Sequence, residues 1–326
     1  MHRSLNCRLT LLLATLLVLA GLAGGQKRDV ILLHVADTHG RIEGQGRGDA
    51  ASGGWARLAT VAERIRRENK DSTVVLIHAG DIFSRGDKLT RRTLGAANVE
   101  LLNAIGFAYW TPGNGEFYDG LENLQARIRQ FAGKALTANV HLAGTEKPLG
   151  VQTDVLEVGD LKIGLFGLCF VREHSRKGLK VSEAEAVKAA LKSLAAAEVD
   201  AVVAVTHIGL DKDLTLAAST PAIDVIIGGH THSLLKTGRL IPNIGGKKTL
   251  VAHAGDYLRF LGRIDLTFTR TDGAWKLSDA RAAVIALDKD VAPDPAIVKR
   301  IAEMSRPGWQ PPRPKDAQQD KAHSEH

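Results

Sequence analysis

Cysteine and aromatic residues are the scarcest features of this sequence. The 326 residues include only two cysteines, Cys7 and Cys169, so cysteine alone can build neither a disulfide framework nor a thiolate metal site. Any metal ion would therefore be bound by histidine, aspartate, glutamate or asparagine. Aromatic residues make up 5% of the chain, whereas 33 residues are glycine. This balance favours an α/β architecture with many tight turns between strands and helices.

The sequence also lacks a large excess of positive or negative charge. Lys+Arg 43 and Asp+Glu 36 give a formal net charge of +7, and no basic patch with interleaved aromatic residues accompanies it. Nucleic-acid binding therefore has only the net charge in its favour. With 44% hydrophobic and 24% charged residues, the composition is typical of a folded domain. It excludes a disordered chain, a collagen-like chain and a polytopic membrane protein.

The two ends of the chain differ in composition from the middle. Arg3 and Arg8 precede an apolar run over residues 9–22, and small residues follow at 23–25. This pattern predicts a signal peptide over residues 1–25 and export to the periplasm or the extracellular medium. The run is shorter than the ~20 residues that span a bilayer, so we expect no membrane span after cleavage. Residues 306–326 are rich in proline, glutamine and charge and are expected to form a disordered tail.

Between these ends, strand-like and helix-like segments alternate, which predicts a mostly buried sheet in an α/β fold. His34, inside the first expected strand, is interpreted as a core histidine with satisfied hydrogen bonds. The expected strands cover residues 30–36, 73–79, a short segment ending at 111–112, 162–168, 201–206, 222–227, 249–253 and 259–267. The expected helices cover residues 55–69, 89–105, 182–197, where Ser182 and Glu185 fit a capping box, and a short helix near 296–304 within a C-terminal helix or linker at 291–305.

Potential metal ligands follow nearly every expected strand. These residues are Asp37, His39, Asp81, Asn114, His207, His230 and His232. Each fragment alone is a weak signal, because a lone histidine after a strand is usually a surface residue. In α/β sheets, however, ligands gather at the carboxyl ends of the strands, so the loops can converge although they are far apart in the sequence. Together they predict one shared metal site.

The motifs around these ligands resemble those of a known family. The matching strings are Leu33-His34-Val35-Ala36-Asp37-Thr38-His39-Gly40, Gly53-Gly54-Trp55-Ala56-Arg57-Leu58, Ala79-Gly80-Asp81-Ile82-Phe83, Pro112-Gly113-Asn114, Val205-Thr206-His207-Ile208-Gly209 and Gly228-Gly229-His230-Thr231-His232. They resemble the calcineurin-like metallophosphoesterases and, within these, the N-terminal catalytic domain of the 5′-nucleotidase branch. The resemblance covers roughly residues 29–288 and implies a catalytic domain over 26–290, folded as a four-layer α/β/β/α sandwich with two metal ions at one end.

The resemblance also implies a role for each ligand. Asp37, His39, Asp81 and His232 would hold the first metal, whereas Asp81, Asn114, His207 and His230 would hold the second, with Asp81 bridging the two. Asn114 and His207 would also lie next to the substrate. Four imidazoles among the ligands favour manganese, zinc or iron over magnesium. The implied reaction is hydrolysis of a small phosphate mono- or diester, nucleotides included, by a hydroxide between the two ions.

One motif departs from the family pattern. Members of this branch read Gly-Asn-His-Glu with an aromatic residue and an aspartate after it, and the His–Asp dyad assists the transition state or protonates the leaving oxygen. Here Gly115 and Tyr118 stand at the two dyad positions. General acid catalysis contributes typically ~10² to 10⁴ in rate. The chain is therefore either a phosphoesterase with altered substrate or mechanism, or a catalytically retired fold that serves as a binding or scaffold protein.

Two residues are candidates for an auxiliary catalytic role. Glu116 lies in the same loop as Gly115, and His253 ends a later strand. Each is weighed against a structural role, because carboxylates in such loops and histidines at strand ends often only support the fold. The resemblance does not extend to the C-terminal domain whose aromatic residues stack the nucleobase in full-length members. A preference for nucleosides is therefore not predicted.

Overall fold

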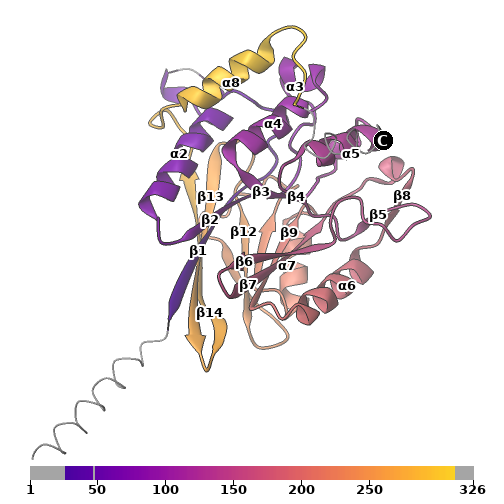
Figure 1. The fold of residues 1–326 in the computed structure, drawn as a ribbon, viewed down its shortest axis with the longest axis vertical. Helices are drawn as coiled ribbons and strands as arrows, with labels where there is room; N and C mark the ends of the chain where they lie inside the picture. Colours follow the sequence, from indigo (N-terminus) through magenta and orange to yellow (C-terminus); the bar gives the residue numbers. More distant parts are fainter. Residues whose placement is uncertain (1–25, 47, 313–326) are drawn as a thin grey trace, which may run out of the picture.

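Two six-stranded sheets form the centre of the molecule (Figure 1). The computed structural model describes residues 26–46 and 48–312, so the expected signal peptide lies outside the described residues. The first sheet has the order β14 (Ala274–Ala286), β13 (Phe260–Thr271), β1 (Lys27–Val35), β2 (Thr73–His78), β3 (Phe107–Trp110) and β4 (Lys134–Ala135). The second has the order β11 (Arg239–Pro242), β12 (Lys248–His253), β10 (Val225–Gly228), β9 (Ala201–Thr206), β7 (Leu161–Leu168) and β6 (Thr153–Val158). A small ribbon pairs β5 (Val140–Leu142) with β8 (Leu179–Val181).

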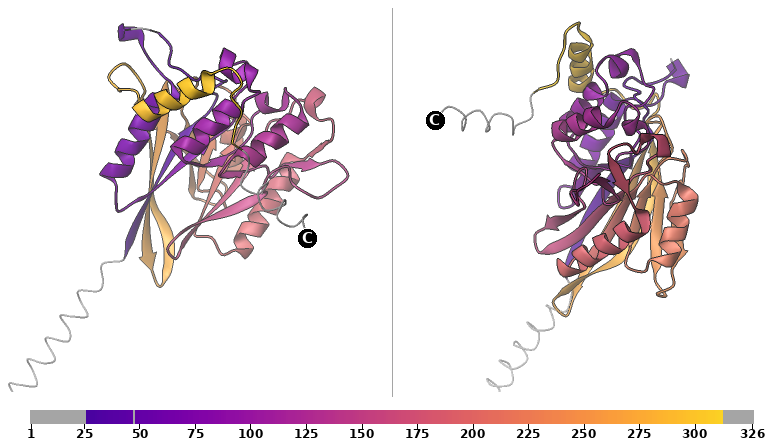
Figure 2. Two further views of the ribbon diagram at one scale, coloured as in Figure 1. Left: turned by 45° about the horizontal axis from the view of Figure 1, so that its top comes forward. Right: turned by 90° about the vertical axis from the view of Figure 1, so that its right-hand side faces the viewer.

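Helices cover the outer face of each sheet (Figure 2). The first sheet is covered by α2 (Trp55–Glu68), α3 (Lys88–Arg92), α4 (Ala96–Ile105), α5 (Leu121–Gln130) and α8 (Pro295–Ser305). The second is covered by α6 (Glu183–Ala196) and α7 (Leu210–Ser219). Short 3-10 helices lie in the connecting loops at η1 (Gly48–Ala50), η2 (Gly115–Phe117) and η3 (Glu173–Ser175).

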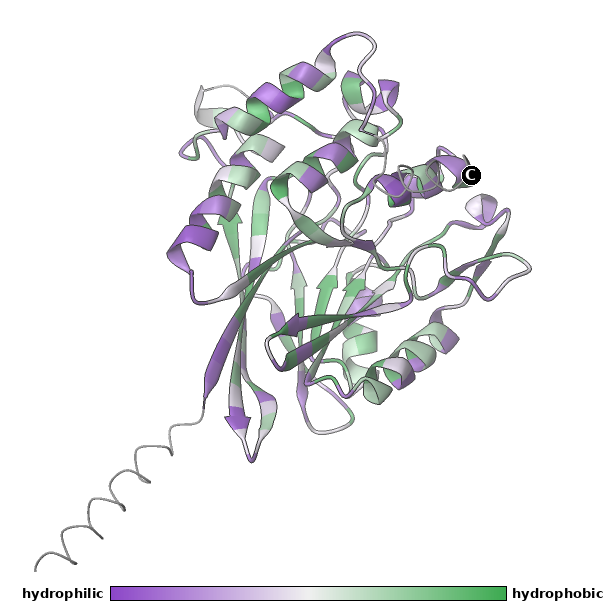
Figure 3. Cartoon of the chain, in the orientation of Figure 1, coloured by the Kyte–Doolittle hydropathy of each residue, from purple (hydrophilic) through white to green (hydrophobic). Residues whose placement is uncertain are grey.

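Side-chain alternation along the strands creates three hydrophobic cores. On β1, Ile31 and Leu33 pack against the helices, whereas Leu32 packs into the layer between the sheets. The third core lies between α6, α7 and the second sheet. Because successive strand residues point to opposite faces, a strand that is apolar throughout can serve two cores. Figure 3 shows these apolar strands inside and the hydrophilic surfaces of the helices outside. The expected four-layer α/β/β/α sandwich is confirmed.

Local differences from the sequence analysis have identifiable causes. The expected helix over 89–105 is two helices, because Leu94 and Gly95 adopt left-handed φ values of 47° and 80°. The helix α6 begins after Ser182, but this serine makes no side-chain capping hydrogen bond, so the capping-box prediction is wrong. The hairpin of β13 and β14 was not predicted as a whole, since the expected strand ended at residue 267.

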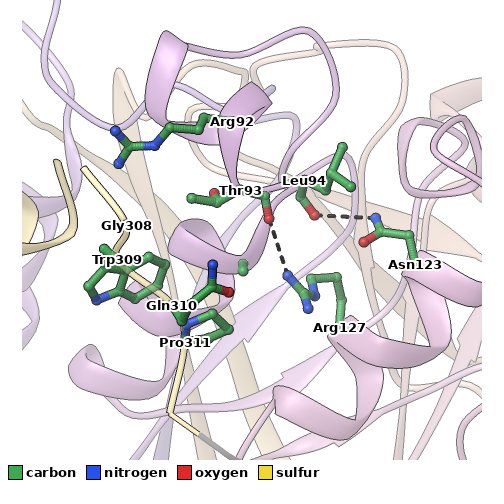
Figure 4. A pocket seen from close by; sticks show the side chains of 10 residues that line it. Arg92, Thr93, Leu94, Asn123, Arg127, Gly308, Trp309, Gln310 and Pro311 are labelled. Carbon is green, nitrogen blue, oxygen red and sulfur yellow. Dashed lines mark hydrogen bonds between the residues drawn. The ribbon is translucent and has the colours of Figure 1, made fainter. Parts of the chain in front are cut away.

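The C-terminal segment packs on the helices of the first sheet. The Arg92 guanidinium donates hydrogen bonds to the carbonyl groups of Met304 and Ser305 at the end of α8. Beyond α8, the half-buried Trp309 packs against the first core and lines a cavity of about 320 Å³ with Arg92 and Arg127 (Figure 4). Within the expected tail, Trp309 thus packs on the domain, and residues 313–326 lie outside the described residues. Among residues 26–312, apart from 47, no helix combines the length and apolarity needed to cross a bilayer.

His34 is buried in β1, 1% exposed, as expected of a core histidine. Its Nδ1 atom has no hydrogen-bond partner among the described residues, so the expectation of satisfied hydrogen bonds is wrong. Burial and, to a lesser extent, the neighbouring His253 lower the pKa of His34 from 6.5 to about 3. Between about pH 3 and pH 6.5, this imidazole is therefore neutral in the folded protein and protonated in the unfolded chain.

We predict that His34 makes the protein sensitive to acid. Because the folded pKa is depressed, its contribution is complete above pH 6.5 and is lost as the pH falls toward 3. The loss is at most about 1.4 kcal/mol per pH unit. Urea unfolding between pH 7 and 4 should show a shallower decline for His34→Leu than for the wild type. His141→Leu, at a half-buried position on β5, is the control, and equal slopes for wild type and His34→Leu would contradict the prediction.

Candidate metal centre

Five strands deliver the expected ligands to one edge of the sandwich. In the first sheet β1, β2 and β3 run parallel, and in the second β9 and β10 run parallel. Asp37 and His39 follow β1, Asp81 follows β2 and Asn114 follows β3. His207 follows β9, and His230 and His232 follow β10. The structure thus brings all seven expected side chains together.

The ligand atoms form two overlapping groups. Asp37, His39 and His232 offer atoms that all lie within 4.8 Å of one another, and so do Asp37, Asp81 and His207. Within the first group, His39 Nε2 lies 2.9 Å from His232 Nε2, and His232 Nε2 lies 3.6 Å from Asp37 Oδ1. Within the second, His207 Nε2 lies 3.4 Å from Asp81 Oδ1 and 3.8 Å from Asp37 Oδ1. Asp37, which was expected beside the first metal only, belongs to both groups.

The histidine rings are oriented by hydrogen bonds at Nδ1. His207 Nδ1 donates to the carbonyl oxygen of Ala79 at 2.7 Å, and His232 Nδ1 donates to Asp256 Oδ2 at 2.8 Å. His39 Nδ1 is hydrogen bonded to Ser84 Oγ at 3.0 Å. A neutral imidazole that donates from Nδ1 keeps its lone pair on Nε2. Hydrogen bonds of this kind fix the tautomer and the ring orientation of metal-binding histidines.

Two buried polar atoms in the centre lack a hydrogen-bond partner among the described residues. They are Nε2 of His207 and Oδ1 of Asn114. The Asn114 oxygen and, in the neutral ring, the His207 nitrogen can donate an electron pair, and burying such an atom without a partner costs about 1–3 kcal/mol. A divalent cation accepts electron pairs from both atom types, so the residues present fit a metal ion.

Backbone strain is concentrated at the same residues. Five ligands have left-handed backbone conformations: Asp37 (φ 53°), His39 (φ 47°), Asp81 (φ 56°), His230 (φ 80°) and His232 (φ 55°). A non-glycine residue rarely adopts this conformation, and it persists only where the surroundings enforce it. Here the turns after the strands redirect each side chain toward a common point. This strain favours a functional role for the loops over a purely structural one.

The charges in the centre favour a cation. Burial, together with the nearby Asp81 carboxylate, raises the pKa of Asp37 to about 6, although His207 opposes the shift. For His207, burial lowers the pKa, but the charges of Asp81 and Asp37 outweigh this effect and raise it to about 10. For His230, burial and then the charge of His207 lower the pKa to about 4. A positive charge between Asp37 and Asp81 is therefore stabilised, because it offsets the repulsion between the two carboxylates.

The centre opens into a cavity of about 260 Å³. Its walls include His39, Asp81, Asn114, His230 and His232, together with Arg41, Ser84, Arg85, Tyr118, Arg172 and Tyr257. None of the three arginines has a carboxylate partner within the described part of the chain. Unpaired guanidinium groups around a cation site favour an anionic ligand such as a phosphate.

Neither auxiliary candidate lines this cavity. His253 is buried, and its Nε2 atom is paired with Asp213 Oδ2 at 2.8 Å in the interior. Glu116 is fully buried and accepts hydrogen bonds from the backbone amides of Asp81, Ile82, Phe83 and Gly113. The structure gives Glu116 the role of holding the loops after β2 and β3 together. These contacts favour the structural alternative for both residues.

Sequence reasoning missed two supporting residues, Asp256 and Ser84. Asp256 follows β12 in a Gly255-Asp256-Tyr257 turn, and this strand-end position was a usable signal. Ser84 offered no such signal, because its role depends on the ring of His39 and on Gly115, which lie elsewhere in the sequence.

The chain matches the family model for the calcineurin-like phosphoesterases over residues 31–234. It belongs to this family. The Treponema pallidum protein named "Probable 5'-nucleotidase" is 31% identical over 273 residues, covering 74% of this chain and 46% of that protein. The chain thus spans about half the length of this phosphoesterase relative. Members of the family use divalent metal ions, in agreement with the candidate ligands of this structure.

Solved structures share the phosphoesterase fold. The 5'-nucleotidase precursor from Thermus thermophilus superimposes with a TM-score of 0.77 at 24% identity, covering 86% of this chain and 59% of that one. The calcineurin-like phosphoesterase YfkN from Bacillus subtilis superimposes with a TM-score of 0.73 at 21% identity, covering 86% of this chain and 97% of that one. At these identities the agreement concerns the fold alone.

We predict that Glu116 stabilises the loops that carry Asp81 and Asn114. In Glu116→Gln an amide NH₂ group would face backbone N–H donors, so the free energy of unfolding should fall by about 2–3 kcal/mol. Urea unfolding measures this change, with Glu122→Gln at an exposed position of α5 as the matched control. Equal stability of the Glu116→Gln variant and the control would show that the two hydrogen bonds at the replaced oxygen are dispensable.

Proposed function

We propose that the chain is a phosphoesterase that hydrolyses small phosphate mono- or diesters with the help of two divalent metal ions. The observation that carries the proposal is the convergence of seven potential ligands, with unpartnered atoms on His207 and Asn114, at a cavity lined by unpaired arginines. Family membership supports the class of reaction.

The positions of the Asp81 and Asp37 oxygen atoms are the basis for assigning each ligand group to a metal ion. Asp81 Oδ1 faces His207, and its Oδ2 lies 3.8 Å from His39 Nδ1 on the other side. This arrangement supports Asp81 as the bridging ligand. His39 and His232 would complete the first metal site, and Asn114, His207 and His230 the second. Asp37 Oδ1 lies near ligands of both, so it would contribute to either site. Two bound divalent ions would lower the pKa of a water molecule and stabilise the charge that develops on the phosphoryl oxygens.

The chain's own residues would bind and orient the substrate. Arg41, Arg85 and Arg172 line the cavity and offer donors to phosphate oxygens. Arg41 is held over the ring of Tyr257, 5.0 Å from its centroid, which places a positive charge at the rim. Among the described residues, we identify no aromatic surface on which a nucleobase would stack. We therefore define the substrate by its phosphate ester and include nucleotides because of the relatives' names. Export to the periplasm or extracellular medium is proposed from the N-terminal sequence pattern.

A catalytically retired fold is the second candidate. The observation that favours it is the replacement of the dyad by Gly115 and Tyr118. The space beside Gly115 is occupied, because a Cβ atom on Gly115 would lie 2.3 Å from Ser84 Oγ and 2.5 Å from Ser84 Cβ. A histidine side chain at position 115 therefore requires Ser84 to move. The ligand set, in contrast, is complete, and this favours retained metal-dependent chemistry.

We predict about two bound divalent ions per chain after loading with manganese or zinc. The loaded protein should hydrolyse p-nitrophenyl phosphate or bis-p-nitrophenyl phosphate. His207→Asn should lose at least one ion and lower kcat by more than about 100-fold, since a ligand and its lone pair are removed. His141→Asn is the control for the same chemical change outside the cavity. Elemental analysis and steady-state kinetics measure both effects. A folded wild-type protein that binds metal but hydrolyses neither ester would favour the retired fold.

We predict that Gly115 and Ser84 are coupled. Gly115→His alone should destabilise the protein by about 1–3 kcal/mol, because the new side chain overpacks against Ser84. In a Ser84→Gly background the same change should cost less, so a double-mutant cycle in urea unfolding should give a favourable coupling energy. Additive effects would mean that Ser84 does not exclude the family histidine. Kinetics of the double variant then test whether the restored histidine increases hydrolysis.

A further inference from the structure

We propose that the Tyr118 hydroxyl donates a hydrogen bond to the phosphoryl group of the substrate, and that Asn114 and Arg172 hold it for this purpose. The inference rests on the proposed function and names the residue that contacts the substrate in place of the missing dyad. It assigns Tyr118 a binding role that the family motif does not contain, since an aspartate stands at this position in the motif.

The hydrogen bonds around Tyr118 leave its proton free. Asn114 Nδ2 donates to the Tyr118 oxygen at 2.7 Å, and Arg172 Nε donates to the same oxygen at 2.9 Å. Both nitrogen atoms can only donate, so the phenol oxygen is the acceptor in both bonds. The Tyr118 O–H group therefore needs an acceptor elsewhere. No described residue supplies one.

The position of Tyr118 directs this donor toward the candidate centre. Tyr118 lines the same cavity as Asp81, His230 and Arg172 and is 37% exposed. The Asn114 amide links Tyr118 to the candidate centre. Its Nδ2 atom contacts Tyr118, whereas its Oδ1 is the unpartnered atom assigned to a metal. The phenol oxygen is thus one amide group away from the proposed ligand atom. An anion bound at the centre is the acceptor that the geometry provides.

The surroundings fix the ring and polarise the hydroxyl. The imidazole of His174 stacks on Tyr118 with ring centroids 6.3 Å apart and an interplanar angle of 21°. Two donors on the phenol oxygen, one of them cationic, withdraw electron density from the O–H bond. Both donors therefore favour donation of the hydroxyl proton to an anionic acceptor. The remaining N–H groups of Arg172 have no partner among the described residues and can contact the same anion.

The test compares Tyr118→Phe with Tyr109→Phe. The control removes a hydroxyl that donates to Asp154 outside the cavity, so the chemical change is the same. Both variants and the wild type are prepared as the full chain loaded with manganese. Three quantities are measured: metal ions per chain by elemental analysis, Kd for inorganic phosphate by calorimetry, and kcat and KM for p-nitrophenyl phosphate.

Tyr118→Phe should keep the wild-type metal content, raise the phosphate Kd by about five- to tenfold and lower kcat by about 10- to 100-fold. Tyr109→Phe should leave all three quantities unchanged. Arg172→Met should also weaken phosphate binding, and it should add less in the Tyr118→Phe background than in the wild type, because the two residues act as a unit.

Two outcomes would overturn the inference. An unchanged phosphate Kd and kcat in Tyr118→Phe would mean that the hydroxyl does not contact the ligand. A loss of bound metal in the same variant would mean that Tyr118 only positions Asn114. If the wild type binds metal and phosphate but hydrolyses no ester, the proposed function fails, and the phosphate Kd values still decide the role of Tyr118. If the wild type binds neither, both fail.

Discussion

The repulsion between two buried carboxylates is the constraint on which the candidate centre depends. Asp37 and Asp81 are 1% and 3% exposed, so water does not screen their charges. The surrounding groups partly compensate, through His207 and through backbone amides such as that of Gly115, which donates to Asp81 at 2.6 Å. The remaining negative charge favours a cation at the centre. The same preference explains why the imidazole Nε2 atoms face inward while their Nδ1 atoms are occupied by Ala79, Asp256 and Ser84.

The sandwich supplies the rigidity that such a centre requires. The left-handed backbone at five ligands is unfavourable, and isolated loops would relax. Each of these loops leaves a strand buried in one of the two sheets, and the interlayer core fixes the sheets relative to each other. Glu116 adds a local constraint, because one carboxylate accepts hydrogen bonds from the loops after both β2 and β3. Packing energy from the cores therefore supports the strained geometry at the edge.

The loop after β3 connects the candidate centre with neighbouring side chains. A glycine at position 115 makes room for Ser84, whose hydroxyl in turn orients His39. Three residues further along, Tyr118 turns back toward Asn114 and meets Arg172 from the loop after β7. Both sides of Asn114 are thus occupied by interacting groups, Ser84 with His39 on one side and Tyr118 with Arg172 on the other.

The sequence by itself determined the α/β alternation and the set of potential ligands, and the four-layer fold followed from the resemblance of the motifs to a known family. The alternation and the ligands are local features, because apolar strands, glycine-rich turns and the polar residue after each strand can be recognised within a few residues. The tertiary structure decided the rest. Asp37 belongs to both ligand groups only because two sheets bring their edges together. Glu116 and His253 proved to be interior supports, while Asp256, Ser84 and Arg172 contact the centre through residues distant in the sequence. No local pattern encodes such contacts, because they arise from the packing of separate segments.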